Sequence, residues 1–275
     1  MATVRAPAAS GRFYPEAADE LERAVRDLLA PLRPFSHPAA ARAALAPHAG
    51  YLYSGVTAAH VFARLRLPDT IVIVAPNHTG VCQAPGGASL WESGAFRTPL
   101  GDVHVDQDLA AALSAACGLV APDHAAHADE HAVEVLLPFI QLAAPRARIV
   151  PLILAWDDWD SCLALGQALA EVIRARETDT LLLASSDLNH YESAAVSEIK
   201  DAQALAALKE LDGETLLARC RRERISMCGR APAAAVCVAA RALGASRAEV
   251  VDYRNSGWVT GDESSVVGYA GAVIP

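Results

Sequence analysis

Hydrophobic residues occur in short unbroken runs that alternate with longer segments of helical periodicity. The runs that predict β-strands are residues 43–47, 71–76, 148–154, 180–186, 250–253 and 265–274. An unbroken apolar run is typical of a strand buried on both faces of a parallel sheet. The segments that predict helices are residues 17–29, 54–65, 106–116, 130–142, 160–174, 194–211, 213–222 and 232–243. Strands that alternate with helices indicate a layered α/β fold.

The chain shows no internal repeat and no linker, so we expect residues 1–275 to form a single domain. The segment rich in glycine and proline between strands, residues 84–94, is predicted to be a loop. Apolar residues make up 53% of the 275, which is enough for a sizeable core.

The composition excludes several classes of function. The net charge of −9 gives no electrostatic footprint for nucleic acid or for an anionic membrane. The one basic run, residues 219–224, is interpreted as the solvated end of a helix. No segment has the apolar length of a signal peptide or a membrane span. The six cysteines form no CxxC pair, so neither a disulfide framework nor a zinc ribbon is expected, and a cytoplasmic location fits best.

Histidines follow three of the predicted strands, at the point where each strand ends. His48 and His78 lie in the sequences APHAGY and APNHTG, and Asp187 and His190 lie in SSDLNHY. Ligands of open α/β sheets bind beyond the carboxyl ends of the strands, where these side chains converge if the strands are neighbours. One such histidine usually just hydrogen-bonds its own loop. The same arrangement at three strand ends favours a shared metal or catalytic site.

Two further segments carry candidate residues. His131 and Glu134 have the i, i+3 spacing of one helical face, although a solvated helix start is an equally good interpretation of this acidic segment. Cys228 precedes a predicted helix start at Pro232, where a thiol pKa can be lowered, and this suits a ligand or a nucleophile.

Other residues and motifs are expected to have no role in the site. Cys162 and Cys237 are predicted to be core residues, and His124 and His127 are predicted to lie in a surface loop. The chain lacks GxxxxGK[ST], GxGxxG, GxSxG and HExxH. The usual sequence signals are therefore absent for nucleotide binding, for hydrolysis by an α/β-hydrolase serine and for zincin proteolysis.

These motifs, in this order, resemble those of the Memo family, whose bacterial and archaeal members are called AmmeMemoRadiSam system protein B. The matching segments are GRFYP (11–15), APHAGYLYSG (46–55), APNHTG (75–80), DEHAVEVLLPF (129–139), SSDLNHY (185–191), MCGRAP (227–232) and the tail at 253–271. The resemblance implies an α/β fold like that of class III extradiol dioxygenases, with a central, mostly parallel sheet flanked by helices.

The resemblance also implies a ligand set. Two histidines and a cysteine hold the metal in Memo proteins, and they fall here on His48, His78 and Cys228. Asp187 and His190 match neighbouring pocket residues, and His131 matches the DEH motif, so it is predicted to be a catalytic pocket residue.

The leading functional prediction is a metal-dependent oxidoreductase of dioxygenase type that acts on an unknown small molecule and uses Fe(II). His190 would act as general acid–base and Asp187 would orient it or the metal ligands. Tyr51 and Tyr191 are predicted to contact the substrate, with ordinary packing as the alternative.

Two other functions stay open at this point. A cysteine is a softer ligand than a carboxylate and could favour copper or zinc. The chain could therefore be a non-enzymatic protein that binds copper, iron or a peptide, or a metal-dependent hydrolase. The name of the family implies a pathway association with a radical SAM protein and an AMMECR-type protein.

Overall fold

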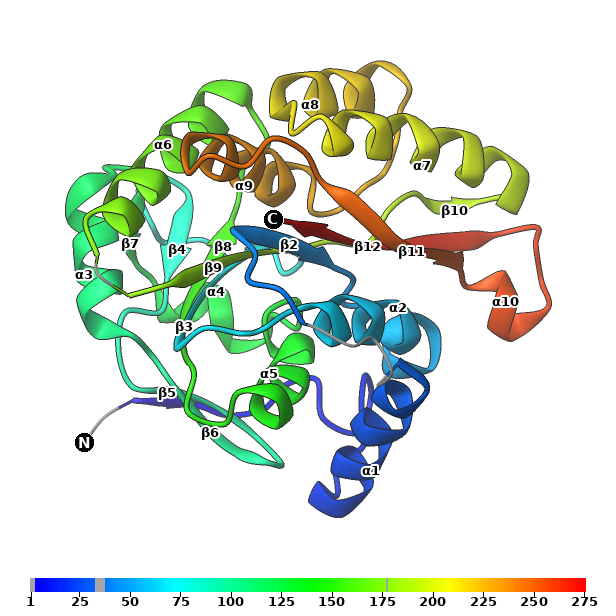
Figure 1. Cartoon of the computed structure of the whole chain (residues 1–275), viewed down its shortest axis with the longest axis horizontal. Coiled ribbons are helices and arrows are strands. Elements are labelled where there is room, and N and C mark those ends of the chain that lie inside the picture. The colour runs from blue at the N-terminus through cyan, green and yellow to red at the C-terminus, as the bar shows by residue number, and fades with distance from the viewer. Residues whose placement is uncertain (1–2, 33–37, 177) are drawn as a thin grey trace.

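Four parallel strands form the centre of a larger mixed sheet (Figure 1). The computed structural model describes residues 3–32, 38–176 and 178–275. The central strands, in spatial order, are β2 (Ala43–Ala46), β9 (Thr180–Ser185), β3 (Thr70–Pro76) and β8 (Arg148–Leu154). All seven residues of β3 are buried, as its unbroken apolar run predicts for a strand covered on both faces.

Further strands extend the sheet on both sides, and most of them pair antiparallel. Beside β2 lies β12 (Val266–Ile274), which also pairs antiparallel with β10 (His190–Glu192) and β11 (Glu249–Asn255). Beside β8 lies β4 (Ala88–Leu90), antiparallel to it, followed by β7 (Val120–Pro122). The α/β prediction is confirmed, but only the central strands are uniformly parallel. The predicted loop at 84–94 is wrong in part, because it contains β4.

Helices cover both faces of the sheet (Figure 1). One face carries α1 (Ala18–Leu29), α2 (Tyr51–Arg64) and α5 (Leu137–Ala143). The other face carries α6 (Trp159–Arg174), α7 (Ala194–Lys209), α8 (Gly213–Arg222) and α9 (Arg230–Ala242). The edge beside β7 is covered by α3 (Gln107–Ala116). Among the described residues, no helix is both long and apolar enough to cross a membrane.

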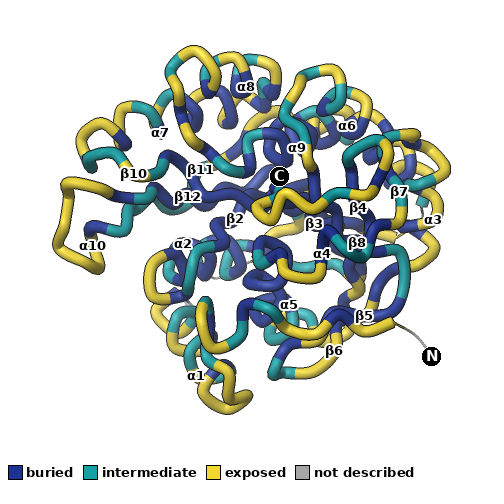
Figure 2. The backbone as a smooth tube through the Cα atoms, turned by 180° about the vertical axis from the view of Figure 1, so that it is seen from behind, coloured by how far each residue is buried: buried dark blue, intermediate teal, exposed yellow. Residues whose placement is uncertain are grey.

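Short elements complete the described part of the chain. The remaining helices are α4 (His124–Ala128), α10 (Gly257–Thr260) and the 3₁₀ turns η1 (Ala30–Leu32) and η2 (Glu134–Leu136). A separate three-stranded sheet consists of β1 (Val4–Arg5), β5 (Ala95–Thr98) and β6 (Gly101–His104). Figure 2 shows the burial that results, with the central strands dark blue and the outer turns yellow.

The contact between α6 and α9 is unusually close. A Cβ atom at Gly166 would lie 2.6 Å from the carbonyl oxygen of Ala235, so only glycine allows this approach. Cys162 and Cys237 are fully buried on these two helices, which confirms their prediction as core residues.

The predicted helix over residues 130–142 is right only in part. The chain there forms a turn, then η2, and only then α5, which has Pro138 in its first turn. Two carboxylates break the helical pattern: Glu130 and Glu134 are buried rather than solvated, so their side chains point inward from a turn. The prediction of a surface His127 is wrong. Its side chain is fully buried in α4, and its Nε2 lies 3.0 Å from the carbonyl oxygen of Ser89.

Candidate metal centre

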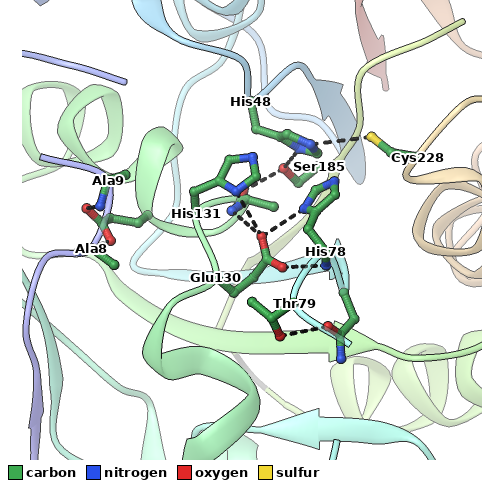
Figure 3. A network of polar contacts seen from close by, with 12 residues as sticks. Ala8, Ala9, His48, His78, Thr79, Glu130, His131, Ser185 and Cys228 are labelled. Atoms are coloured by element: carbon green, nitrogen blue, oxygen red, sulfur yellow. Dashed lines mark hydrogen bonds and ion pairs between the residues drawn. The ribbon is translucent and has the colours of Figure 1, made fainter. Parts of the chain in front are cut away.

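Three histidine rings meet beyond the carboxyl ends of the central strands (Figure 3). His48 follows β2 and His78 follows β3, and their ring centroids lie 5.1 Å apart. His131 comes from the turn between α4 and η2, and its ring stacks on that of His78 at 4.6 Å. One ring nitrogen of each histidine lies within 4.8 Å of the others, close enough for all three to serve one metal ion. β2 and β3 each pair in parallel with β9, so the loops of His48 and His78 leave the same edge of the sheet on either side of the end of β9.

Hydrogen bonds determine which ring nitrogen of His48 faces the cluster. Its Nδ1 lies 2.6 Å from the hydroxyl of Ser185, which ends β9. That hydroxyl donates its only proton to the carbonyl oxygen of Ala132, at 2.6 Å. The hydroxyl must therefore accept from an Nδ1–H group on His48, which leaves the Nε2 lone pair free for a metal.

Glu130 holds the other two histidines. Its carboxylate accepts hydrogen bonds from Nδ1 and from the backbone N–H of His78, at 2.9 and 2.6 Å. The same carboxylate lies 3.3 Å from Nδ1 of His131 and accepts from the backbone N–H of Ala132. With Nδ1 engaged in both rings, Nε2 is again the nitrogen available to a metal. A carboxylate behind a ligating histidine is the usual support of a protein metal site.

The surroundings also favour uncharged imidazoles at two positions. Burial, with a smaller contribution from the neighbouring His78, lowers the pKa of His48 to about 3. Burial and the charge of His48 lower the pKa of His131 to about 4. Both rings are therefore neutral near pH 7, which is the form that binds metals.

His78 and Glu130 form a charge-coupled pair. Burial alone would lower the pKa of His78, but the hydrogen bond and charge of Glu130 outweigh it and raise the pKa. Burial would raise the pKa of Glu130, but the bonds and charge of His78 lower it to about 2. Glu130 is therefore an ionised acceptor that holds His78 and His131.

Cys228 lies beside this cluster. Its Sγ is 3.4 Å from Nε2 of His48 and accepts from the backbone N–H of Asp187 at 3.2 Å. The next residue, Gly229, packs so closely on the end of β9 that a Cβ there would lie 2.3 Å from the carbonyl oxygen of Ser185. Burial and the charge of Asp187 raise the pKa of the thiol, so the lowering expected for a cysteine near a helix start does not occur. A metal at this position would displace the thiol proton.

Asp187 and His190 lie around the same histidines. The Asp187 carboxylate is buried and accepts from the backbone N–H of His48 at 2.9 Å, and burial raises its pKa. His190 lies in β10, within electrostatic range of Asp187 and His48. Its buried Nδ1 has no hydrogen-bond partner in the part of the chain that the structure describes. His190 thus has a ring nitrogen free for proton transfer.

The two tyrosines have different surroundings. Tyr51 is buried at the start of α2, and its hydroxyl donates to the carbonyl oxygen of Val135 at 2.9 Å. Tyr191 is 77% exposed and has a φ of 62°, a left-handed conformation that is uncommon for a residue other than glycine. Strained backbone of this kind clusters at functional sites, and here it follows His190 directly.

Two supporting residues escaped the sequence reasoning. Glu130 stands next to His131 in the motif DEH, and Ser185 directly follows an apolar run, but neither position signals which histidine it contacts. Those contacts join residues 52 and 137 positions apart in the chain.

Known proteins resemble the chain over nearly its whole length. The model of the family described as Memo-like protein matches residues 5–273. A MEMO1 family protein of Methanopyrus kandleri is 39% identical over 281 residues, covering 98% of each chain. A MEMO1 family protein of Aquifex aeolicus is 38% identical over 272 residues, covering 98% of this chain and 99% of its own. The resemblance in the sequence motifs is thereby confirmed, and the chain belongs to the Memo family.

Proposed function

We propose that the chain is a metal-dependent oxidoreductase of dioxygenase type that acts on a small molecule and uses Fe(II). The observation that carries the proposal is the set of three histidines with one ring nitrogen of each within 4.8 Å of the others, two of them hydrogen-bonded through Nδ1 to Ser185 and Glu130 and the third with Nδ1 3.3 Å from Glu130. Such support behind each ligand is expected of a metal centre and has no purpose for histidines that only cap loops.

The donor set suits a redox metal with open positions. His48 and His78 supply two imidazoles from the ends of β2 and β3, which flank β9. His131 lies within metal-binding distance of both, and the Cys228 Sγ lies 3.4 Å from Nε2 of His48. Two histidines with one further ligand leave coordination sites free in non-heme iron oxygenases. Bound Fe(II) would supply the electron-transfer chemistry that activates dioxygen. The Memo resemblance implies a fold like that of class III extradiol dioxygenases, and such a kinship of fold does not fix the reaction by itself.

The residues around the histidines would handle protons. His190 offers a ring nitrogen, unpartnered among the described residues, for accepting or donating a substrate proton. The Asp187 carboxylate anchors the loop of His48 by accepting from the backbone N–H of His48. The same carboxylate lies within electrostatic range of His190. In this arrangement Asp187 orients the loop that carries His48.

Oxygen uptake tests the proposed function. The full chain is purified without oxygen, loaded with Fe(II) and mixed with a panel of catechols and related dihydroxy compounds in an oxygen electrode. We expect uptake that depends on both protein and substrate and that disappears in His48→Ala. Uptake no faster than that of free Fe(II), across the panel, would contradict the proposal.

A second function is favoured by one specific contact. The Sγ of Cys228 lies 3.4 Å from Nε2 of His48, and a thiolate beside imidazoles is a soft site suited to Cu(I). Competition with a Cu(I) chelator distinguishes this function from the first. Copper held tightly by a chain that takes up no oxygen would favour metal handling over catalysis.

A further inference from the structure

The GRFYP segment, residues 11–15, has no part in the site as described so far, although it lies directly against it. The Phe13 ring stacks on His131, with centroids 4.3 Å apart and planes 28° apart. His131 in turn stacks on His78 at 25°. Phe13, His131 and His78 therefore form one continuous stack of three rings, and His48 meets the two histidines edge-on.

His131 needs this support more than the other histidines do. It comes from a turn, whereas His48 and His78 directly follow strands of the central sheet. Its Nδ1 lies 3.3 Å from Glu130, a longer contact than the 2.9 Å of His78 or the 2.6 Å between His48 and Ser185. Hydrogen bonding alone therefore holds His131 least firmly, and the packing of its two faces has to fix the ring.

Phe13 is itself held in place from several directions. Its backbone N–H donates to the carbonyl oxygen of Ala9, and its own carbonyl accepts from the backbone N–H of Tyr51 at 2.8 Å. A Cβ at Gly50 would lie 3.4 Å from that carbonyl oxygen, so the segment runs close against the start of α2. On its outer face the ring is covered by the Arg12 guanidinium, 5.9 Å from the centroid.

A buried carboxylate ties this segment to the chain that carries His131. Glu134, three residues after His131, is fully buried and accepts from the backbone N–H groups of Ala8 and Ala9 at 2.8 and 2.9 Å. It also accepts from the Tyr14 hydroxyl and pairs with Arg5. Glu134 thus connects the segment that carries Phe13 to the segment that carries His131.

We propose that Phe13 is a positioning residue of the metal centre, which holds the His131 ring so that its Nε2 faces the same point as those of His48 and His78. The inference rests on the proposed metal centre. It assigns a role to the GRFYP motif: Phe13 contacts the ligand ring, and Tyr14 anchors the segment through Glu134.

Cobalt(II) binding to the full chain tests the proposal, because Co(II) reports its own coordination through its visible absorption. Phe13→Ala removes the stacked ring, Phe13→Leu keeps apolar volume without an aromatic face, and Phe13→Tyr keeps the ring. Leu52→Ala is the matched control, since Leu52 lines the same surface hollow as Phe13 and is 69% exposed. The melting temperature of each metal-free variant shows whether it folds.

We expect Phe13→Ala and Phe13→Leu to bind Co(II) at least about tenfold more weakly and with an altered spectrum, as loss of a supporting group around a metal does. Phe13→Tyr should restore wild-type affinity and spectrum, and Leu52→Ala should leave both unchanged. Wild-type binding and spectrum in folded Phe13→Ala or Phe13→Leu would overturn the positioning role while leaving the metal centre intact. Failure of the wild-type chain to bind Co(II) would overturn the proposed function itself.

Discussion

Replacing Asp201 by asparagine should stabilise the protein at neutral pH, although the side chain is fully buried. Asp201 lies in α7 beneath the loop that carries Asp187 and His190. Its carboxylate accepts from the backbone N–H of Asn189 at 2.8 Å and from the Tyr253 hydroxyl at 2.9 Å. Both donors are uncharged, so they compensate the buried charge only in part. Burial raises the pKa of Asp201 to about 6, and the charge of Glu192 adds to the rise.

The sign and size of the effect follow from this shift. A carboxyl with a higher pKa in the folded state than in the unfolded state costs nothing below the unfolded value, and it destabilises the fold as the pH rises through the folded value. From an ordinary value of 3.8 to about 6, the cost is about 1.5 kcal/mol at pH 5 and about 3 kcal/mol at pH 7. Asparagine removes this cost and keeps both contacts, because its carbonyl accepts from Asn189 and its amide donates to Tyr253.

Urea denaturation of the metal-free wild-type chain and of Asp201→Asn, at pH 5 and pH 7, measures the difference directly. We expect the variant to be more stable at both values, with an advantage about twice as large at pH 7. Glu192→Gln is the control, since it removes the neighbouring charge and leaves the buried carboxylate in place. An advantage that does not change with pH, or a variant less stable at pH 7, would refute the reasoning.

Three further substitutions test the site. Glu130→Gln removes the ionised acceptor behind His78 and His131, so Co(II) affinity measured by titration should fall about 10- to 100-fold, and an unchanged affinity would count against the support role. Cys228→Ser should weaken binding of Cu(I) more than that of Fe(II) in chelator competition, because it replaces a soft donor by a hard one; equal losses would argue against a ligand role. His190→Ala should leave iron content unchanged and abolish oxygen uptake, whereas loss of iron would make His190 a ligand.

The centre of the fold could be predicted because its signal is local. The unbroken apolar runs of β2, β3, β8 and β9 predict strands that are buried on both faces. The polar residues of the following loop mark the end of each run. The meeting of His48 and His78 then follows from the parallel order β2-β9-β3, which places both loops at one edge of the sheet. The resemblance to the Memo family, which rests on the same motifs, was confirmed by comparison.

The segment around His131 could not be predicted, because its conformation depends on distant partners. Apolar and acidic spacing there is that of an amphipathic helix with a solvated start. In the folded chain Glu134 is buried against Arg5, 129 positions away, and Glu130 against His78, 52 positions away. These buried carboxylates replace the helix by a turn and bring His131 to the other histidines. The sheet of β1, β5 and β6 was missed for a different reason: its strands are only two to four residues long, too short to show a pattern.

The metal content per chain is the direct test of whether the three histidines form a metal centre. The full chain is purified without oxygen and its metals are quantified by mass spectrometry, together with His48→Ala and with His124→Ala, whose ring pairs with Glu92 outside the cluster. We expect about one iron per wild-type chain, retained in His124→Ala and lost in His48→Ala. A wild-type chain that holds no metal, even after reconstitution with Fe(II), Cu(I) or Zn(II), would contradict the proposed metal centre.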